Sequence, residues 1–78
     1  MPRFYLNIRD GDDLIEDQEG SVLVDVDAAR LEALASARDI LAELVRAGRL
    51  VDGQCFEIMD DSGELRAVVP FKEALKLD

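Results

Sequence analysis

The chain has 78 residues, of which 18 are acidic and nine are basic, so that its net charge at pH 7 is −9. This length allows one small domain with a single core, and the sequence has no run of about 18 apolar residues that would cross a membrane. The excess of negative charge argues against direct binding of nucleic acid phosphates or anionic lipids, and it favours a partner protein with a basic face.

The first segment predicts a strand followed by tight turns. Arg3 to Arg9 alternates apolar and polar residues, which is typical of a half-buried strand. Asp10-Gly11 then has the composition of a turn, and we expect Leu14-Ile15 to return as a short antiparallel strand. The polar stretch from Glu16 to Gly20 is turn-like, and residues 21–24 lead into the next element as a briefly extended segment.

The densest acidic stretch of the chain surrounds these turns, with six carboxylates within ten residues. The pattern of a calcium-binding loop fails here, because Leu14 and Ile15 occupy the positions where the fifth ligand and the glycine belong. We therefore expect a solvated acidic loop that contacts a basic partner, with no metal. The candidate partner-binding residues are Asp10, Asp12, Asp13, Glu16, Asp17 and Glu19.

The stretch from Asp25 to Arg49 predicts the one long helix. Apolar residues recur at spacings of three and four, Ala is frequent, and neither Gly nor Pro interrupts the stretch before Gly48. We expect Asp25 to be the N-cap, with Asp27 as the alternative, and Gly48 to be the left-handed residue that ends the helix. The side chains expected to face the core are Val26, Ala33, Leu34, Ala37, Ile40, Leu41, Leu44 and Val45.

The last third of the chain predicts a hairpin and a short helix. Gln54–Asp60 and Glu64–Val69 read as two strands joined by a tight turn. The inner face of the second strand is chosen so that Arg66 stays out of the core. Pro70 ends this strand because it has no N–H for a ladder, and Phe71–Leu77 predicts one or two helical turns. The side chains expected to face inward are Phe56, Ile58, Leu65, Ala67, Val69, Phe71, Ala74 and Leu75.

Together these elements predict an α+β domain over residues 1–78, in the order β-β-α-β-β-α. A helix with one apolar stripe requires a sheet with one apolar face, so we expect a small antiparallel sheet of about four short strands with the long amphipathic helix packed on one face. The other face carries Tyr5, Asn7, Glu57 and Arg66, and it is left for solvent, the C-terminal tail or a second subunit.

Residues that commonly carry catalysis are scarce in this chain. It has no histidine, which is the commonest general base and metal ligand. Cys55 is alone, and we expect a packed structural thiol that resists alkylation in the native protein. Arg30 lies within the apolar arc of the helix and is expected to extend to solvent, or to Asp12 or Asp17. We therefore expect no catalytic residues, no cofactor and no enzyme activity.

The order and spacing of four pieces resemble a family of short uncharacterised proteins that is common in rhizobia and related alphaproteobacteria. The pieces are PRFYLNIRDGD, LIEDQEG, DVDAARLEALASAR and DGQCFEIMDDSGELRAVVPFKEAL. This resemblance covers nearly the whole chain and implies a bacterial cytoplasmic protein of unknown function, without functional residues to carry over. About the first 45 residues are also similar in architecture to the sheet-and-helix antitoxins of bacterial toxin–antitoxin pairs, although shared architecture does not transfer function.

We interpret the sequence as a small binding or regulatory module that acts through protein contacts. An antitoxin-like neutraliser of a basic partner is the alternative, and a small enzyme is the third hypothesis. The expected partner is a protein with a basic face or a second copy of the chain, with no direct binding of nucleic acid and no membrane contact. The single cysteine and the lack of an apolar signal core in the first ten residues predict a cytoplasmic location.

Overall fold

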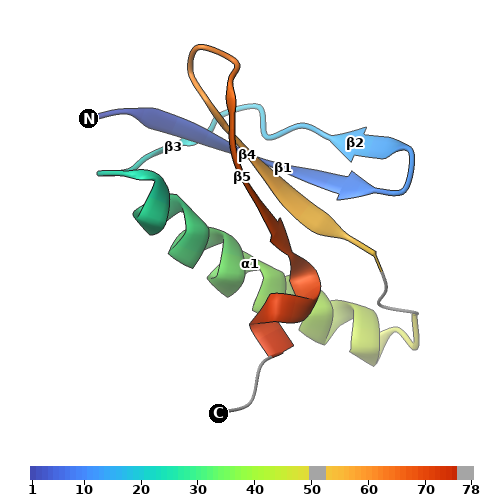
Figure 1. Ribbon diagram of the computed structural model, residues 1–78. Coiled ribbons are helices and arrows are strands. Elements are labelled where there is room, and N and C mark those ends of the chain that lie inside the picture. The colour runs from blue at the N-terminus through green and yellow to red at the C-terminus, as the bar shows by residue number, and fades with distance from the viewer. Residues whose placement is uncertain (50–52, 76–78) are drawn as a thin grey trace.

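A computed structural model of the chain describes residues 1–49 and 53–75, and it shows one antiparallel sheet with a long helix on one face (Figure 1). The strands are β1 (Arg3–Asp10), β2 (Asp13–Ile15), β3 (Ser21–Val22), β4 (Cys55–Asp60) and β5 (Leu65–Pro70). Their order is β2-β1-β4-β5, and β3 pairs with the same edge of β1 as β2 does. The α+β prediction is confirmed, but the described sheet has five strands and not four. The extra strand β3 has only two residues, too few to show an alternating pattern.

The long helix α1 spans Val26–Arg46, and its ends follow the sequence. Asp25 is extended, and its carboxylate accepts a hydrogen bond of 2.8 Å from the backbone N–H of Ala28, which confirms the predicted N-cap. Gly48 has a φ of +72°, which confirms the left-handed residue after the helix. The helix crosses one face of the sheet, and the short helix Phe71–Leu75 lies beside its second half (Figure 1).

The core lies between α1 and the sheet, and small residues on α1 let the helix approach the strands closely. Its buried residues are Phe4, Ala29, Ala33, Ala37, Leu41, Phe56, Ile58, Val69, Phe71 and Ala74. Most of the predicted helix stripe is buried or partly buried, but Val45 is 70% exposed, so that assignment is wrong. Val45 lies at the edge of the apolar arc and lines a groove there. Ala29, which the sequence analysis did not include, is fully buried.

A shift in the pairing of β4 with β5 corrects one position of the predicted inner face of β5, whereas Ala67 and Val69 pack in the core as predicted. Ile58 pairs with Ala67, but Met59 pairs with Leu65, so that β5 has one extra residue at this point. Side chains along a strand alternate between the two faces of the sheet. A bulge of one residue therefore moves the side chain beyond it, here that of Leu65, to the other face. Leu65 is therefore 49% exposed, and its predicted inward position is wrong.

The C-terminal element η1 (Phe71–Leu75) is a 3₁₀ helix that closes one end of the core. Its three residues per turn place Phe71 and Ala74 on the same side, and both are buried. Leu75 falls outside that side and is 55% exposed, which corrects its predicted inward position. The ring of Phe71 lies 5.0 Å from that of Phe56, centroid to centroid. The predicted extension of this helix to residues 76 and 77 lies outside the described residues.

The second face of the sheet is open in the part of the chain that the structure describes. Tyr5, Asn7 and Arg9 of β1 lie there opposite residues of β4, and none of these three is fully buried. Cys55 shares this face and is half-buried, so the prediction of a fully packed thiol is corrected. Its surroundings still raise the pKa of the thiol, mainly through burial. None of the described helices is long and apolar enough to cross a membrane.

Candidate functional site

The most developed site on the open face is a polar hollow of about 440 Å³ at the end of the sheet where β1 begins. Three segments form it: β1, the loop between β2 and β3, and the end of β4 with the turn that follows it. Their positions follow from the pairing of β1 with β4, in which Tyr5 lies opposite Met59. The lining residues are Tyr5, Asn7, Glu16, Asp17, Gln18, Met59, Asp60, Asp61 and Gly63.

Asp17 holds the loop that forms one wall of the hollow. β2 and β3 pair with opposite ends of the β1 edge, and the loop between them runs past the middle of that edge. There the Asp17 carboxylate accepts a hydrogen bond of 3.2 Å from the backbone N–H of Leu6. It also accepts bonds of 3.3 Å and 3.1 Å from the N–H groups of Glu19 and Gly20. Asp17 thus replaces a strand partner for β1 and orders its own loop.

Two further contacts complete this wall. The side-chain oxygen of Asn7 accepts a hydrogen bond of 2.9 Å from the backbone N–H of Asp17. Gly20 has a φ of +70°, and a Cβ at this position would lie 2.8 Å from the ring of Tyr5 and 2.9 Å from the carbonyl oxygen of Phe4. A glycine is therefore required for both the backbone conformation and the close approach of the ring. These contacts place Tyr5 firmly on the floor of the hollow.

Asp60 organises the opposite wall. One oxygen of its carboxylate accepts hydrogen bonds from the hydroxyl and N–H of Ser62 and from the N–H of Glu64, at 2.6 Å, 3.0 Å and 3.0 Å. The other oxygen forms an ion pair of 3.3 Å with Arg66. The bond from the Ser62 hydroxyl, followed by that from Glu64, lowers the pKa of Asp60 from its ordinary value of 3.8 to about 2. Asp60 is therefore ionised at neutral pH, with both oxygens engaged within the chain.

The remaining two carboxylates of the hollow are free to bind a ligand. Glu16 comes from the loop wall and Asp61 from the turn wall, and both are exposed. Within the described residues, neither carboxylate forms a hydrogen bond or an ion pair. Beside them, the floor consists of the Tyr5 ring and the thioether chain of Met59, which are both half-buried. The arrangement combines two uncompensated negative charges with an apolar floor.

The centre of the open face has the opposite character, because its charges compensate each other. Arg9 forms an ion pair with Glu57, with 3.1 Å between Nε and Oε2, and both side chains are partly exposed. The hydrogen bond that Arg9 donates to the Glu57 carboxylate is the main reason that the pKa of Arg9 is raised. This pair leaves little net charge at the centre of the open face.

The structure separates the six acidic residues predicted to bind a partner into two groups. Asp10, Asp12 and Asp13 lie in the exposed hairpin of β1 and β2, where Asp10 and Asp13 face each other across the strands. That hairpin lies at the opposite end of β1 from Tyr5 and the hollow. Glu16 and Asp17 line the hollow, whereas Glu19 is exposed beside it. The backbone carbonyl of Glu19 accepts a hydrogen bond of 2.8 Å from Arg3.

Sequence reasoning did not assign Asp60 and Asp61 to the site. The turn from Asp60 to Gly63 was recognisable as a turn, but 42 or more residues separate it from Glu16 and Asp17 in the sequence. Only the register of β1 against β4 brings it to the same place. The predicted contact of Arg30 with Asp12 or Asp17 is wrong. The Arg30 side chain is half-buried and forms no ion pair with either carboxylate in the described chain.

The donor set of the hollow is suited to hydrogen bonding and charge pairing. Among the described residues, no group of three or more His, Cys, Asp or Glu side chains has an arrangement that could hold a metal ion. A carboxylate pair of this kind attracts an ammonium or guanidinium group, and the apolar floor accommodates the aliphatic stem that carries such a group.

Comparison with known proteins gives one match. Residues 3–72 match a family described as Domain of unknown function (DUF6894). This match includes all five strands, the long helix and the first two residues of η1. No curated protein and no solved structure matches the chain.

Proposed function

The chain belongs to this family of unknown function, so its own geometry has to indicate a role, and we propose that it is a small binding module that receives a basic side chain of a partner protein in the polar hollow. The observation that carries this proposal is the pair of free carboxylates, Glu16 and Asp61, on two different walls. Both remain available because Asp17 and Asp60 satisfy the backbone of the two walls.

The floor of the hollow supports a lysine or arginine as the bound side chain. The Tyr5 ring attracts a cation placed over its face, and such a contact contributes about 0.5–1 kcal/mol at an exposed site. Met59 offers a flexible apolar surface that adapts to an aliphatic stem. A volume of about 440 Å³ accommodates one long side chain and its neighbours in a peptide.

The charge of the whole chain supports a basic partner as well. A net charge of −9 on 78 residues creates a negative potential that accelerates encounters with positively charged proteins. The exposed group of Asp10, Asp12 and Asp13 contributes to this long-range attraction from the other end of the sheet. Binding through such charges weakens as salt rises, because the Debye length falls from about 10 Å at 0.1 M to about 3 Å at 1 M.

An NMR titration tests the proposal directly. N-acetyl-arginine amide added to the ¹⁵N-labelled chain at low salt should shift the amide signals of Tyr5, of residues 16–18 and of residues 59–63. N-acetyl-glutamine amide, which has a similar length and no charge, should shift them far less. Signals that move equally for both compounds, or that move all along the chain, would refute a built site.

Two matched double variants locate the binding to the hollow. Glu16→Gln with Asp61→Asn should abolish the shifts, because it removes both free carboxylates. Asp12→Asn with Asp13→Asn removes the same amount of charge from the opposite end of the sheet and should leave most of the binding intact. Equal losses in the two variants would mean that only net charge matters and that the hollow has no specific role.

We also propose a bacterial cytoplasm as the setting of this module. The resemblance of the sequence to short proteins of rhizobia and related alphaproteobacteria supports this proposal, and a single cysteine is in keeping with a reducing compartment. Fractionation of cells that carry an epitope-tagged copy should recover the protein with cytoplasmic markers. Recovery with periplasmic markers would contradict this placement.

A further inference from the structure

α1 carries a second stripe of residues that points away from the sheet. The stripe consists of Leu31, Ala35, Arg38, Ala42 and Val45, which are four, three, four and three residues apart, and all five are exposed. Leu31 and Val45, near its two ends, are 69% and 70% exposed. Alternating spacings of three and four are typical of the seam at which two helices pack side by side. We call these five residues the outer stripe.

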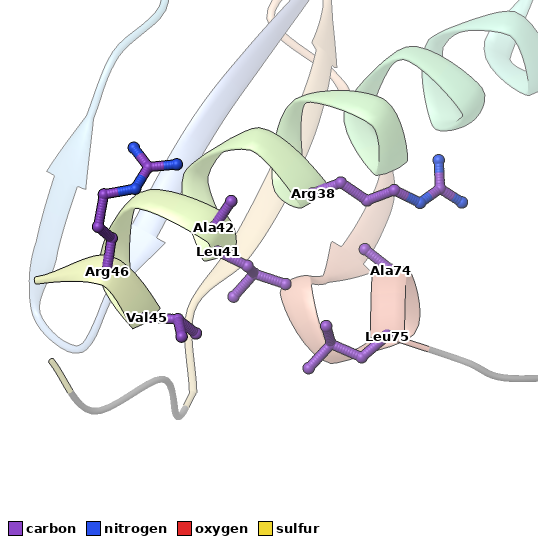
Figure 2. Close-up of a pocket in the computed structure, with 7 residues that line it drawn as sticks. All are labelled: Arg38, Leu41, Ala42, Val45, Arg46, Ala74 and Leu75. Carbon is purple, nitrogen blue, oxygen red and sulfur yellow. The ribbon is translucent and has the colours of Figure 1, made fainter. Parts of the chain in front are cut away.

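A groove runs along the second half of the outer stripe. Its volume is about 800 Å³, and η1 forms its second wall. Figure 2 shows Leu41, Ala42 and Val45 of α1 on one side and Ala74 and Leu75 of η1 on the other. Arg38 and Arg46 border this apolar lining, and their charged ends extend away from it.

We propose that a second copy of this chain docks on the outer stripe, with the two α1 helices antiparallel and related by a two-fold axis beside Arg38 and Asp39. In this arrangement, Leu31 lies opposite the partner's Val45, and Ala35 lies opposite the partner's Ala42. The leucine therefore enters the partner's groove between α1 and η1. The two-fold axis repeats this contact, so both leucines and both grooves are used.

Charge complementarity favours this occupant and this orientation. The same antiparallel register places Glu32 opposite the partner's Arg46, which also pairs with Glu43 of its own helix, and it places Arg38 opposite the partner's Asp39. Each of these contacts occurs twice because of the two-fold axis. A parallel pairing would instead place Glu32 beside its own copy and Arg46 beside its own copy, which is unfavourable for like charges. Arg38 forms no ion pair within the described residues, so its guanidinium is available for the partner's carboxylate.

The small residues of the outer stripe support close packing of the two helices. Ala35 and Ala42 project only a methyl group, so the helix axes can approach to the lower end of the usual range of about 8–10 Å. Leu31 and Val45 then supply the larger apolar contacts at the two ends. A contact of this kind would cover side chains that are now among the most exposed apolar groups of the chain.

Site-directed cross-linking tests both the surface and the orientation. In a Cys55→Ser background, Ala35→Cys combined with Ala42→Cys should give a covalent dimer under mild oxidation, because each cysteine faces the other position of the partner. The two positions are seven residues apart on one helix, about 10 Å, which is too far for a bond within the chain. Ala35→Cys alone should remain largely monomeric, because its two copies lie about 10 Å apart along the pair.

Each alternative result overturns the proposal in a different way. Dimers from Ala35→Cys alone indicate parallel helices, and no cross-link in the double variant means that the outer stripe is not the interface. Sedimentation of the unmodified chain should show a dimer that dissociates on dilution from millimolar concentration. A monomer at every concentration also refutes the proposal.

Charge reversal supplies a second and independent test. Glu32→Arg should weaken the dimer at least about tenfold by facing the partner's Arg46 with a like charge, and Glu32→Arg with Arg46→Glu should recover most of that loss. Glu64→Arg makes the same charge change on the β4–β5 turn and should leave the dimer unchanged. Circular dichroism confirms that each variant is folded. A dimer that is equally weakened by all three variants, or by none, contradicts the antiparallel pairing.

Discussion

Removal of the Asp17 carboxylate should destabilise the chain far more than removal of any other acidic side chain in residues 10–19. Asp17→Ala leaves three backbone N–H groups without their acceptor. The N–H groups of Leu6 and Gly20 are partly buried, whereas that of Glu19 is exposed and can bind water. A hydrogen bond to a charged acceptor contributes about 1.5–3 kcal/mol, and partial access of water reduces this figure. The two partly buried groups together predict a loss of about 2–4 kcal/mol.

Asp17→Asn should have a smaller effect, because the amide keeps one oxygen. That oxygen can still accept from the Glu19 and Gly20 N–H groups, but the amide nitrogen then faces the N–H of Leu6. The loss of one charged hydrogen bond predicts a cost of about 1–2 kcal/mol. The graded order of alanine, asparagine and wild type is therefore a specific consequence of the observed geometry.

Urea denaturation at neutral pH measures these differences, with Asp13→Ala as the matched control. Asp13 is exposed and lies opposite Asp10, so its removal should be neutral or slightly stabilising, within about 0.5 kcal/mol. Hydrogen exchange of the Leu6 amide gives a local readout, since Asp17→Ala should accelerate it. Equal midpoints for Asp17→Ala and Asp13→Ala, together with unchanged exchange at Leu6, would refute the structural role of this carboxylate.

Three further predictions concern the core and the turns. Leu41→Ala should lower the free energy of unfolding by about 2–5 kcal/mol, because Leu41 is 3% exposed. Glu43 is exposed, so Glu43→Ala should change the free energy of unfolding by less than about 0.5 kcal/mol, and thermal melts compare the two variants. Gly20→Ala should destabilise more than Gly63→Ala in the same assay, since both have positive φ but only Gly20 lies against a tyrosine ring and a backbone carbonyl. The pKa of Asp60 is depressed in the folded state, so the ionised carboxylate stabilises the fold above about pH 4, and this stabilisation is lost as the pH falls towards 2. Asp60→Asn should therefore flatten an acid-denaturation profile between about pH 4 and pH 2.

Local patterns in the sequence were sufficient for four of the five described strands and for the two caps of the long helix. The alternation in β1 and β4 follows from the period of two of a strand, and the helix caps follow from the chemistry of single residues. Asp25 accepts from an N–H three residues later, and Gly48 adopts a backbone conformation that other residues avoid. These interactions join neighbours in the chain, so a sequence contains all the information that they need.

The polar hollow required the tertiary structure. Glu16 and Asp61 are far apart in the sequence, and they share one cavity because β1 pairs with β4 in a single register. A register is set by the sum of many contacts across the sheet, and a shift by one residue would move each side chain to the other face. The bulge opposite Met59 shows the same dependence, since it turns Leu65 out of the core.

α1 illustrates the division between the two sources of information most clearly. Its sequence contains two stripes at helical spacing: one includes Ala33, Ala37 and Leu41, and the other is the outer stripe that includes Leu31 and Val45. Periodicity determines that the segment is a helix with apolar faces, because the spacing of three and four residues is a property of the local chain. It predicted the covered stripe but added Val45 to it, because the burial of a residue at the edge of an apolar arc depends on the surface that the sheet and η1 present to the helix. That surface covers Ala33, Ala37 and Leu41, and it leaves Leu31 and Val45 exposed.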